Sequence, residues 1–116
     1  MNRQHLEALR REGYAPRTML DVGAHLGEFT QGFLEVFPGC LPTLIEPNPH
    51  CRDKLLRLPF ERHEVAASNA AGKGELFLSK TWLQSTGSSL YRENTEYFDD
   101  ETAIRHEVDK ARIDDL

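Results

Sequence analysis

Residues 18–30 constrain the fold of this chain more than any other part of the sequence. The first five of them, Thr18–Val22, form a short, β-favouring run that Gly23 closes, which is typical of a buried strand. From Glu28 the spacing of the apolar side chains changes to that of one helix face. The side chains with that spacing are Phe29, Phe33, Val36 and Phe37. We therefore predict a strand, a sharp turn between Gly23 and Gly27, and a helix that begins near Glu28.

The remaining sequence predicts further strands and helices joined by short connections. The signals are changes of periodicity, prolines and glycines at the ends of elements, and capping residues such as Asn48 before Pro49. The expected helices are at 2–12, 28–37 and 48–58, the expected strands at 18–22, 41–45, 63–67, 75–79 and 102–113, and a polar loop at 84–96. This order favours an α/β fold with a doubly wound, mostly parallel sheet, in a single domain over residues 1–116.

Composition excludes several kinds of partner. The chain has a net charge of −5 and its Lys and Arg residues do not cluster, so we expect no nucleic-acid partner. No stretch approaches the roughly 20 apolar residues that cross a bilayer. The first residues are too charged for a signal peptide, so we expect no membrane partner and a cytoplasmic location. Cys40 and Cys51 lack companion ligands at zinc-site spacing and are expected to be apolar fillers, so no metal is predicted.

The turn between Gly23 and Gly27 is the predicted binding site. In doubly wound sheets ligands bind beyond the carboxyl ends of the strands, and the free N–H groups of the following helix suit a carboxylate. A dinucleotide-binding turn has the pattern Gly-x-Gly-x-x-Gly. Here His25 and Glu28 stand at the second and third glycine positions and oppose a diphosphate by bulk and by charge. No Gly-Lys-Ser/Thr follows, which excludes a Walker loop.

Glu46 is an acidic residue whose position also bears on the identity of the ligand. It ends the second predicted strand, nineteen residues after Gly27, where a carboxylate can accept hydrogen bonds from both hydroxyls of a ribose. A glutamate at the end of a strand can also be a solvated cap without a ligand. In combination with the glycine turn, Glu46 favours a nucleoside that carries no phosphates.

Several stretches of the sequence resemble FkbM-type methyltransferases. They are Asp21-Val-Gly-Ala-His-Leu-Gly-Glu28, Ile45-Glu-Pro-Asn-Pro49, Glu64-Val-Ala-Ala-Ser68, Gly87-Ser-Ser-Leu90 and the ending from Val108 to Leu116. The resemblance runs from about Leu9 to the last residue. It implies a class I, Rossmann-like fold that binds S-adenosylmethionine and methylates an oxygen, often a hydroxyl of a sugar or of a small secondary metabolite.

The resemblance also implies which residues hold the cofactor S-adenosyl-L-methionine. The implied set is Asp21, Gly23, Ala24, His25, Gly27, Glu46, Pro47, Asn48, Ala67 and Ser68. The two glycines would face the methionine and ribose parts, and Glu46 would accept hydrogen bonds from the ribose hydroxyls. Pro47 or Asn48 and the end of the third strand would border the adenine. Asp21 would reach the amino-acid end, or else tie down its own glycine turn.

His25 belongs to a residue type that can transfer protons near neutral pH. The resembling family has Asn or His at this position, so a loop-shaping, hydrogen-bonding role is favoured over that of a base. No catalytic residue is therefore predicted, and the methyl acceptor is not specified beyond a small molecule or sugar. Trp82 and Tyr91 flank the polar loop and can either line a substrate pocket or cover the edge of the core.

The resemblance also bears on the edge of the predicted sheet. In the resembling family the chain continues into a strand that lies beside the first strand, whereas this sequence stops at Leu116. The first strand is then expected to be an exposed apolar edge, which proteins normally avoid. We expect an S-adenosylmethionine-dependent O-methyltransferase domain that is incomplete at its C-terminus. The alternatives are a truncated, non-catalytic fragment that forms a homo-oligomer through the open edge, a nicotinamide-binding module, and a structural module without a ligand.

Overall fold

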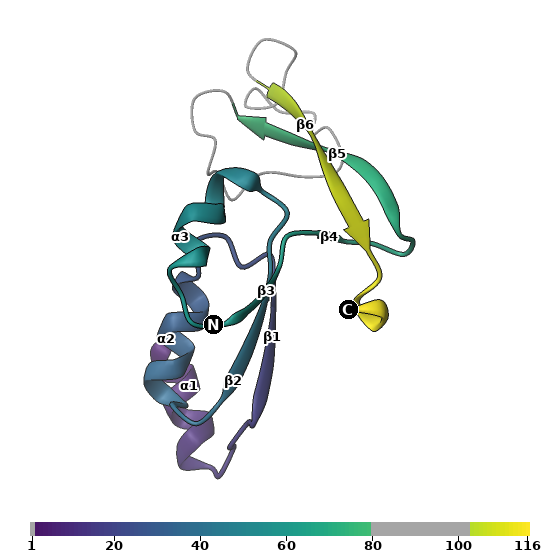
Figure 1. Cartoon of the computed structure of the whole chain (residues 1–116). Coiled ribbons are helices and arrows are strands. Elements are labelled where there is room, and N and C mark those ends of the chain that lie inside the picture. Colours follow the sequence, from purple (N-terminus) through teal and green to yellow (C-terminus); the bar gives the residue numbers. More distant parts are fainter. Residues whose placement is uncertain (1, 80–102) are drawn as a thin grey trace.

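The first sheet of the protein is built from the strands on either side of the predicted turn. The computed structural model describes residues 2–79 and 103–116 (Figure 1). β1 (Thr18–Val22), β2 (Leu41–Ile45) and β3 (Glu61–His63) are parallel and lie in the order β1-β2-β3. The strands expected at 18–22 and 41–45 are confirmed at both ends. The predicted α/β class and the parallel pairing of the first strands are therefore confirmed.

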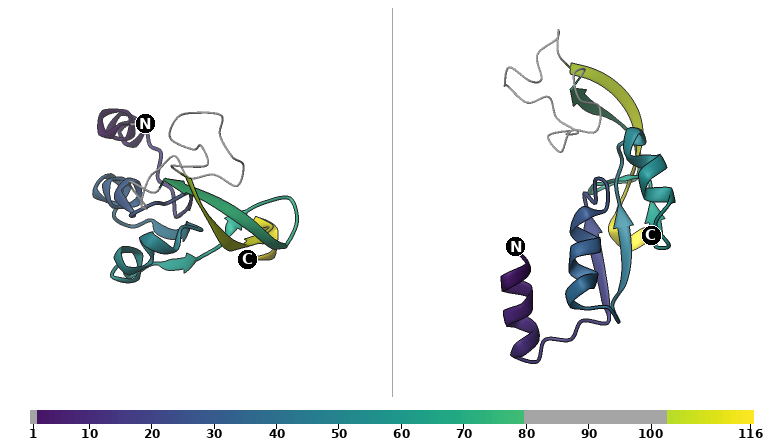
Figure 2. Two further views of the ribbon diagram at one scale, coloured as in Figure 1. Left: turned by 90° about the horizontal axis from the view of Figure 1, so that it is seen from above. Right: turned by 90° about the vertical axis from the view of Figure 1, so that its left-hand side faces the viewer.

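The helices lie on one face of this sheet, as the views in Figures 1 and 2 show together. They are α1 (Arg3–Arg11), α2 (Glu28–Val36) and α3 (Arg52–Leu56), and the short 3-10 helix η1 (Pro49–Cys51) leads into α3. In the described part of the chain no α-helix covers the opposite face, so the structure does not establish a doubly wound sheet. None of the described helices is long and apolar enough to cross a membrane.

Two apolar clusters fill the space between the helices and the sheet. The first joins α1 to α2 and consists of Leu6, Phe33, Val36, Phe37 and Cys40. The second lies between β2, the turn after β1 and α3, and consists of Ala24, Leu44, Cys51 and Leu55. Burying one large apolar side chain stabilises a fold by about 1.5–3 kcal/mol, so these clusters fix the positions of the strand ends that carry the predicted site.

The predicted third strand, residues 63–67, is wrong in its extent. The strand beside β2 is Glu61–His63, after which the chain leaves the first sheet. Ala66 and Ala67 form β4, which pairs in parallel with the end of β6 (Ala103–Ala111) in a second sheet. Packing explains the difference, because Ala66 is buried in a third cluster with Leu76, Leu78 and Val108.

The second sheet has the order β4-β6-β5 and contains the longest strands. β5 (Gly72–Ser79) runs antiparallel to β6, and both predicted strands are confirmed with shifted ends. Lys73 forms an ion pair with Asp109 directly across the ladder. The chain ends in a 3-10 helix, η3 (Ile113–Asp115). The predicted loop at 84–96, with Trp82 and Tyr91, lies outside the described residues.

β1 forms an open edge of the first sheet, because β2 is its only neighbour among the described strands. The carbonyl of Arg17 accepts from the N–H of Leu41, and the N–H of Gly23 donates to the carbonyl of Ile45. Backbone groups of successive residues in a strand point in opposite directions. Every second residue of β1 therefore turns its N–H and C=O away from β2. These residues are Thr18, Leu20 and Val22.

The same residues of β1 also expose their side chains. Leu20 and Val22 are 45% and 51% exposed, and the alternation of the strand places them on the same face of the sheet. Met19, which lies between Thr18 and Leu20, packs instead against the cluster between α1 and α2. The exposed apolar edge expected from the sequence is therefore present in the structure.

Replacement of Gly27 by alanine tests how tightly the turn packs. Gly27 has φ 83°, and a Cβ there would lie 2.5 Å from Cδ1 of Leu58. We expect Gly27→Ala to lower the free energy of unfolding by about 2 kcal/mol, from left-handed strain and displacement of Leu58. Gly13→Ala is the control, because Gly13 has φ 98° and open space around it. In urea unfolding, the control should lose about 1 kcal/mol of its free energy of unfolding. Equal losses in the two variants would show that Leu58 moves aside freely.

Candidate functional site

The turn after β1 folds back onto the end of β2. The N–H groups of Gly23 and Ala24 both donate to the carbonyl of Ile45, at 2.8 and 3.0 Å. The N–H of Gly27 then donates to the carbonyl of Ala24 at 2.8 Å and closes the turn. The turn is thus fixed to the strand end that carries Glu46.

The two glycines of the turn are required for different reasons. Both have a left-handed backbone, with φ 79° at Gly23 and φ 83° at Gly27. Gly27 lies against Leu58, so any side chain there meets the apolar cluster beneath the turn. A Cβ at Gly23 would meet nothing within 4 Å. Gly23 is therefore the position where a ligand can approach the backbone, whereas Gly27 packs the turn onto the core.

Glu46 connects this turn to the loop that follows β2. Its side chain is only 8% exposed, so it is not a solvated strand cap. Oε1 accepts the backbone N–H of His25 at 2.7 Å, and Oε2 accepts that of Asn48 at 2.9 Å. The N–H of Glu46 donates to the carbonyl of His63, at the end of β3, at 3.2 Å. One buried carboxylate thus determines the shape of both loops and lies next to the end of the third strand.

His25 and Asn48 contribute to this arrangement through their backbones. His25 has φ 54°, a conformation that His and Asn adopt more often than most residues. That conformation accompanies the hydrogen bond from its N–H to Glu46. The side chain of Asn48 is 2% exposed, and its oxygen accepts the N–H of His50 at 2.9 Å, as a helix cap does.

Asp21 connects β1 to the helix that follows the turn. Its Oδ2 accepts the hydroxyl of Thr30 at 2.5 Å, and Thr30 is fully buried in α2. This contact holds the first turn of α2 against the strand. Asp21 thus joins the strand before the turn to the helix after it.

The remaining predicted residues lie farther along the chain. Pro47 is half-buried and borders a cavity of about 120 Å³ between η1 and β6. Ala67 belongs to β4, and the N–H of Ser68 donates to the carbonyl of Ala111 at 2.9 Å. Hydrogen bonds thus bring Gly23, Ala24, His25, Glu46 and Asn48 together, whereas Ala67 and Ser68 are bonded to the second sheet.

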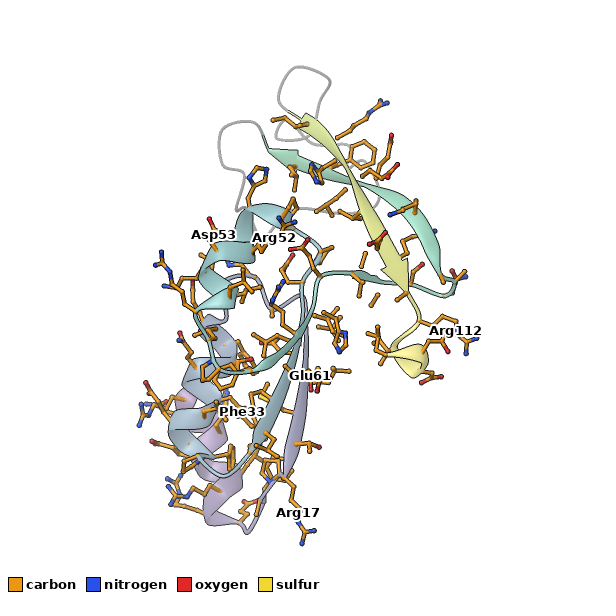
Figure 3. The ribbon with its side chains drawn as sticks, in the orientation of Figure 1. Arg17, Phe33, Arg52, Asp53, Glu61 and Arg112 are labelled. Atoms are coloured by element: carbon orange, nitrogen blue, oxygen red, sulfur yellow. The ribbon has the colours of Figure 1, made fainter. Side chains whose placement is uncertain are left out.

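The charges around the site are unevenly distributed. Arg52, labelled in Figure 3 at the start of α3, binds both oxygens of Glu64 at 2.6 Å and lowers the pKa of that carboxyl. Burial, with the negative charge of Glu46 as a second cause, raises the pKa of the Cys51 thiol to about 12. Cys51 is therefore an inert apolar filler at neutral pH, as expected. No group of three or more potential metal ligands occurs among the residues that the structure describes.

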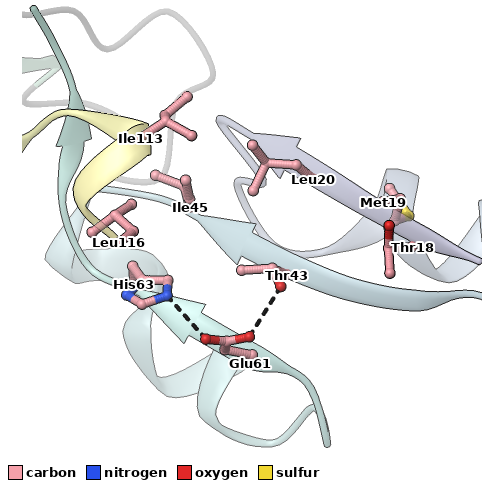
Figure 4. A pocket seen from close by; sticks show the side chains of 9 residues that line it. All are labelled: Thr18, Met19, Leu20, Thr43, Ile45, Glu61, His63, Ile113 and Leu116. Atoms are coloured by element: carbon pink, nitrogen blue, oxygen red, sulfur yellow. Dashed lines mark hydrogen bonds and ion pairs between the residues drawn. The ribbon is translucent and has the colours of Figure 1, made fainter.

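A second cavity, of about 330 Å³, lies on the open face of the first sheet, where η3 approaches it (Figure 4). Glu61 accepts the hydroxyl of Thr43 at 3.2 Å, and its other oxygen is 3.3 Å from Nε2 of His63. Ile113 and Leu116 border the cavity from η3. The alternation of β3 (Glu61–His63) is the sequence signal that places His63 beside Glu61.

A substitution of Glu46 tests its role as an acceptor for both loops. Glutamine offers one acceptor and one donor group, so Glu46→Gln places a donor against a backbone N–H. We expect the free energy of unfolding to fall by about 2 kcal/mol or more, measured by urea unfolding and circular dichroism. Glu28→Gln, on the exposed first turn of α2, is the control and should change it by less than about 0.5 kcal/mol. Equal stability of the two variants would contradict this role of Glu46.

Similarity to known proteins adds no assignment to this site. No protein-family model matches the chain, and neither a curated protein nor a solved structure is found to be similar to it. A functional assignment therefore depends on the geometry of the glycine turn and of Glu46.

Proposed function

We propose that this chain is the cofactor-binding part of an S-adenosylmethionine-dependent methyltransferase. The acceptor is an oxygen, in a hydroxyl of a small molecule or a sugar. The proposal combines the resemblance of the sequence to FkbM-type methyltransferases with the geometry of the turn after β1. One observation carries it: a buried carboxylate, Glu46, is hydrogen-bonded to the backbone of the turn at the carboxyl ends of parallel strands.

The chemistry of Glu46 supports a nucleoside ligand. An ionised carboxylate only accepts hydrogen bonds, and its two oxygens offer about four lone-pair sites. The N–H groups of His25 and Asn48 use one site on each oxygen. The remaining sites suit the two donors of a ribose diol, and bonds to a charged acceptor are stronger than neutral ones.

The start of α2 supports an amino-acid tail on that nucleoside. Gly27 is the N-cap of α2 and has no side chain to accept an N–H of the first turn. Such a helix start attracts a carboxylate. A Cβ at Gly23 would meet nothing within 4 Å, so a ligand can lie against the backbone there. The residues present therefore fit S-adenosylmethionine better than a dinucleotide.

The protein contributes alignment to this reaction. S-adenosylmethionine supplies an electrophilic methyl group on its sulfonium. Glu46 and the glycine turn would hold the nucleoside, and the start of α2 would hold the amino-acid end. Holding two reactants in line removes much of the entropic cost of their meeting. No side chain of the described residues is assigned as a base.

Calorimetry with S-adenosylhomocysteine tests the ligand. We expect saturable binding, and we expect Gly23→Ala to weaken it by about tenfold or more, because the added methyl group occupies the open space beside the turn. Gly13→Ala is a matched control: it introduces the same left-handed strain after α1, far from Glu46. The control should bind as wild type does. Absence of binding at millimolar ligand, or equal weakening by both substitutions, would overturn the assignment.

A second candidate function rests on the open edge of β1. Its outward N–H and C=O groups and the exposed Leu20 and Val22 can pair with another copy of the chain. In this case the chain is not catalytic, and self-association covers the edge of β1.

Sedimentation velocity over a range of concentrations tests this alternative. Wild-type protein should associate as its concentration rises, and Leu20→Lys should remain monomeric because it places a charge on the edge. Leu41→Lys is the control, since Leu41 is 72% exposed at the start of β2, a strand that lies between β1 and β3 and does not form the open edge. A wild-type monomer at every concentration excludes association through β1.

A further inference from the structure

The open face of the first sheet carries a cavity that lies outside the predicted cofactor site. Its volume is about 330 Å³, within the range of about 300–1,000 Å³ that is typical of small-molecule sites. Side chains of β1, β2 and β3 line it, and Ile113 and Leu116 border it from η3 (Figure 4). Of the described residues that line the cavity, none belongs to the predicted cofactor set. The cavity is therefore a candidate for a second binding site.

A single carboxylate supplies the negative charge of this cavity. Oε2 of Glu61 accepts the hydroxyl of Thr43 at 3.2 Å, and Oε1 lies 3.3 Å from Nε2 of His63. The side chain of Glu61 is 67% exposed, and a carboxylate has about four lone-pair sites, so these two contacts leave acceptor sites for a ligand. His63 carries a positive charge only when it is protonated, and no Lys or Arg occurs among the described residues that line the cavity. A positively charged ligand therefore complements the cavity.

Thr43 adds a second acceptor beside this carboxylate. Its hydroxyl directs the proton at Glu61, so the oxygen can still accept a hydrogen bond from a ligand. A primary ammonium group has three donors and can bond to both side chains at once. A quaternary ammonium group has no donor, and Glu61 would repel a carboxylate on the ligand. The polar groups of the cavity thus favour a primary amine.

The rest of the wall of the cavity is apolar. Leu20, on β1, is 45% exposed, and Ile45, on β2, is buried. Ile113 and Leu116 are 39% and 46% exposed. A ligand that covers these side chains removes apolar surface from water, which is favourable. A ligand that fits the cavity therefore has an apolar body attached to its ammonium group.

We propose that this cavity binds a small organic cation, a primary amine with an apolar body. The ammonium group bonds to Glu61 and Thr43, and the body lies against Leu20 and the side chains of η3. The inference is independent of the proposed function, because the described residues that line the cavity include neither the glycine turn nor Glu46. Binding of S-adenosylhomocysteine therefore neither supports nor contradicts it.

Titrations followed by NMR of the backbone amides test the site with three probes of similar shape. The probes are phenethylamine, 2-phenylethanol and 3-phenylpropanoate, whose end groups are cationic, neutral and anionic. At about pH 8, where histidine is generally neutral, phenethylamine should shift amides of β2, β3 and η3 saturably. It should bind about threefold more tightly than the alcohol, the effect of one exposed charge pair, and the anionic probe should bind most weakly.

Two glutamine variants separate the charge of the cavity from the net charge of the protein. Glu61→Gln keeps an acceptor for Thr43 but removes the charge, so it should bind phenethylamine only as tightly as 2-phenylethanol. Glu75→Gln is the control, because Glu75 is exposed on β5 in the second sheet and its replacement changes the net charge equally. Equal binding of the amine and the alcohol by the wild type, or equal effects of the two variants, overturns the charge recognition.

Two further outcomes overturn the proposed site as a whole. One is the absence of amide shifts with all three probes at millimolar concentration. The other is a set of shifts in β3 and η3 that depends on protein concentration without any probe, because a second copy of the chain then occupies this face. Ile113→Ala checks the apolar contact: it should weaken binding of the amine and of the alcohol alike and leave their ratio unchanged.

Discussion

The carboxylate of Glu46 is the contact on which the geometry of the site depends. It accepts one N–H from the turn after β1 and one from the loop after β2, so the two strand ends cannot move apart without exposing a buried charge. Leaving such a group unpaired costs far more than a single surface contact contributes. The left-handed backbone of His25, the packing of Gly27 on Leu58 and the cap formed by Asn48 all occur in the two loops that this carboxylate joins.

Local sequence patterns were sufficient to predict the first half of the fold. β1 and β2 are short apolar runs bounded by glycine or proline, and the stripe of Phe33 and Val36 identified α2 because its period differs from that of a strand. The third strand could not be delimited in this way. The run from 61 to 67 contains no glycine or proline that would mark a break, and its division between two sheets depends on the distant residues that bury Ala66.

The glycine turn was predictable from the sequence, but its contacts were not. Glycine spacing and the position of Glu46 located the turn, since both follow from chain geometry. Sequence could not distinguish the open Gly23 from the packed Gly27, because the neighbour that decides this, Leu58, lies 31 residues along the chain from Gly27. Nor could it show that Glu46 is buried and bonded to two backbone donors, because burial of a strand end depends on the loops above it.

The transfer of the chain from the first sheet to the second after His63 leaves two units with separate apolar clusters among the described residues. The apolar cluster of β4, β5 and β6 shares no member with the two clusters beneath the helices. Regions with separate cores can open one at a time, and each then has its own free energy of local unfolding and its own rate of amide hydrogen exchange. The glycine turn and Glu46 lie wholly in the first unit. Fraying of the long β5–β6 ribbon therefore leaves the amides of the turn protected.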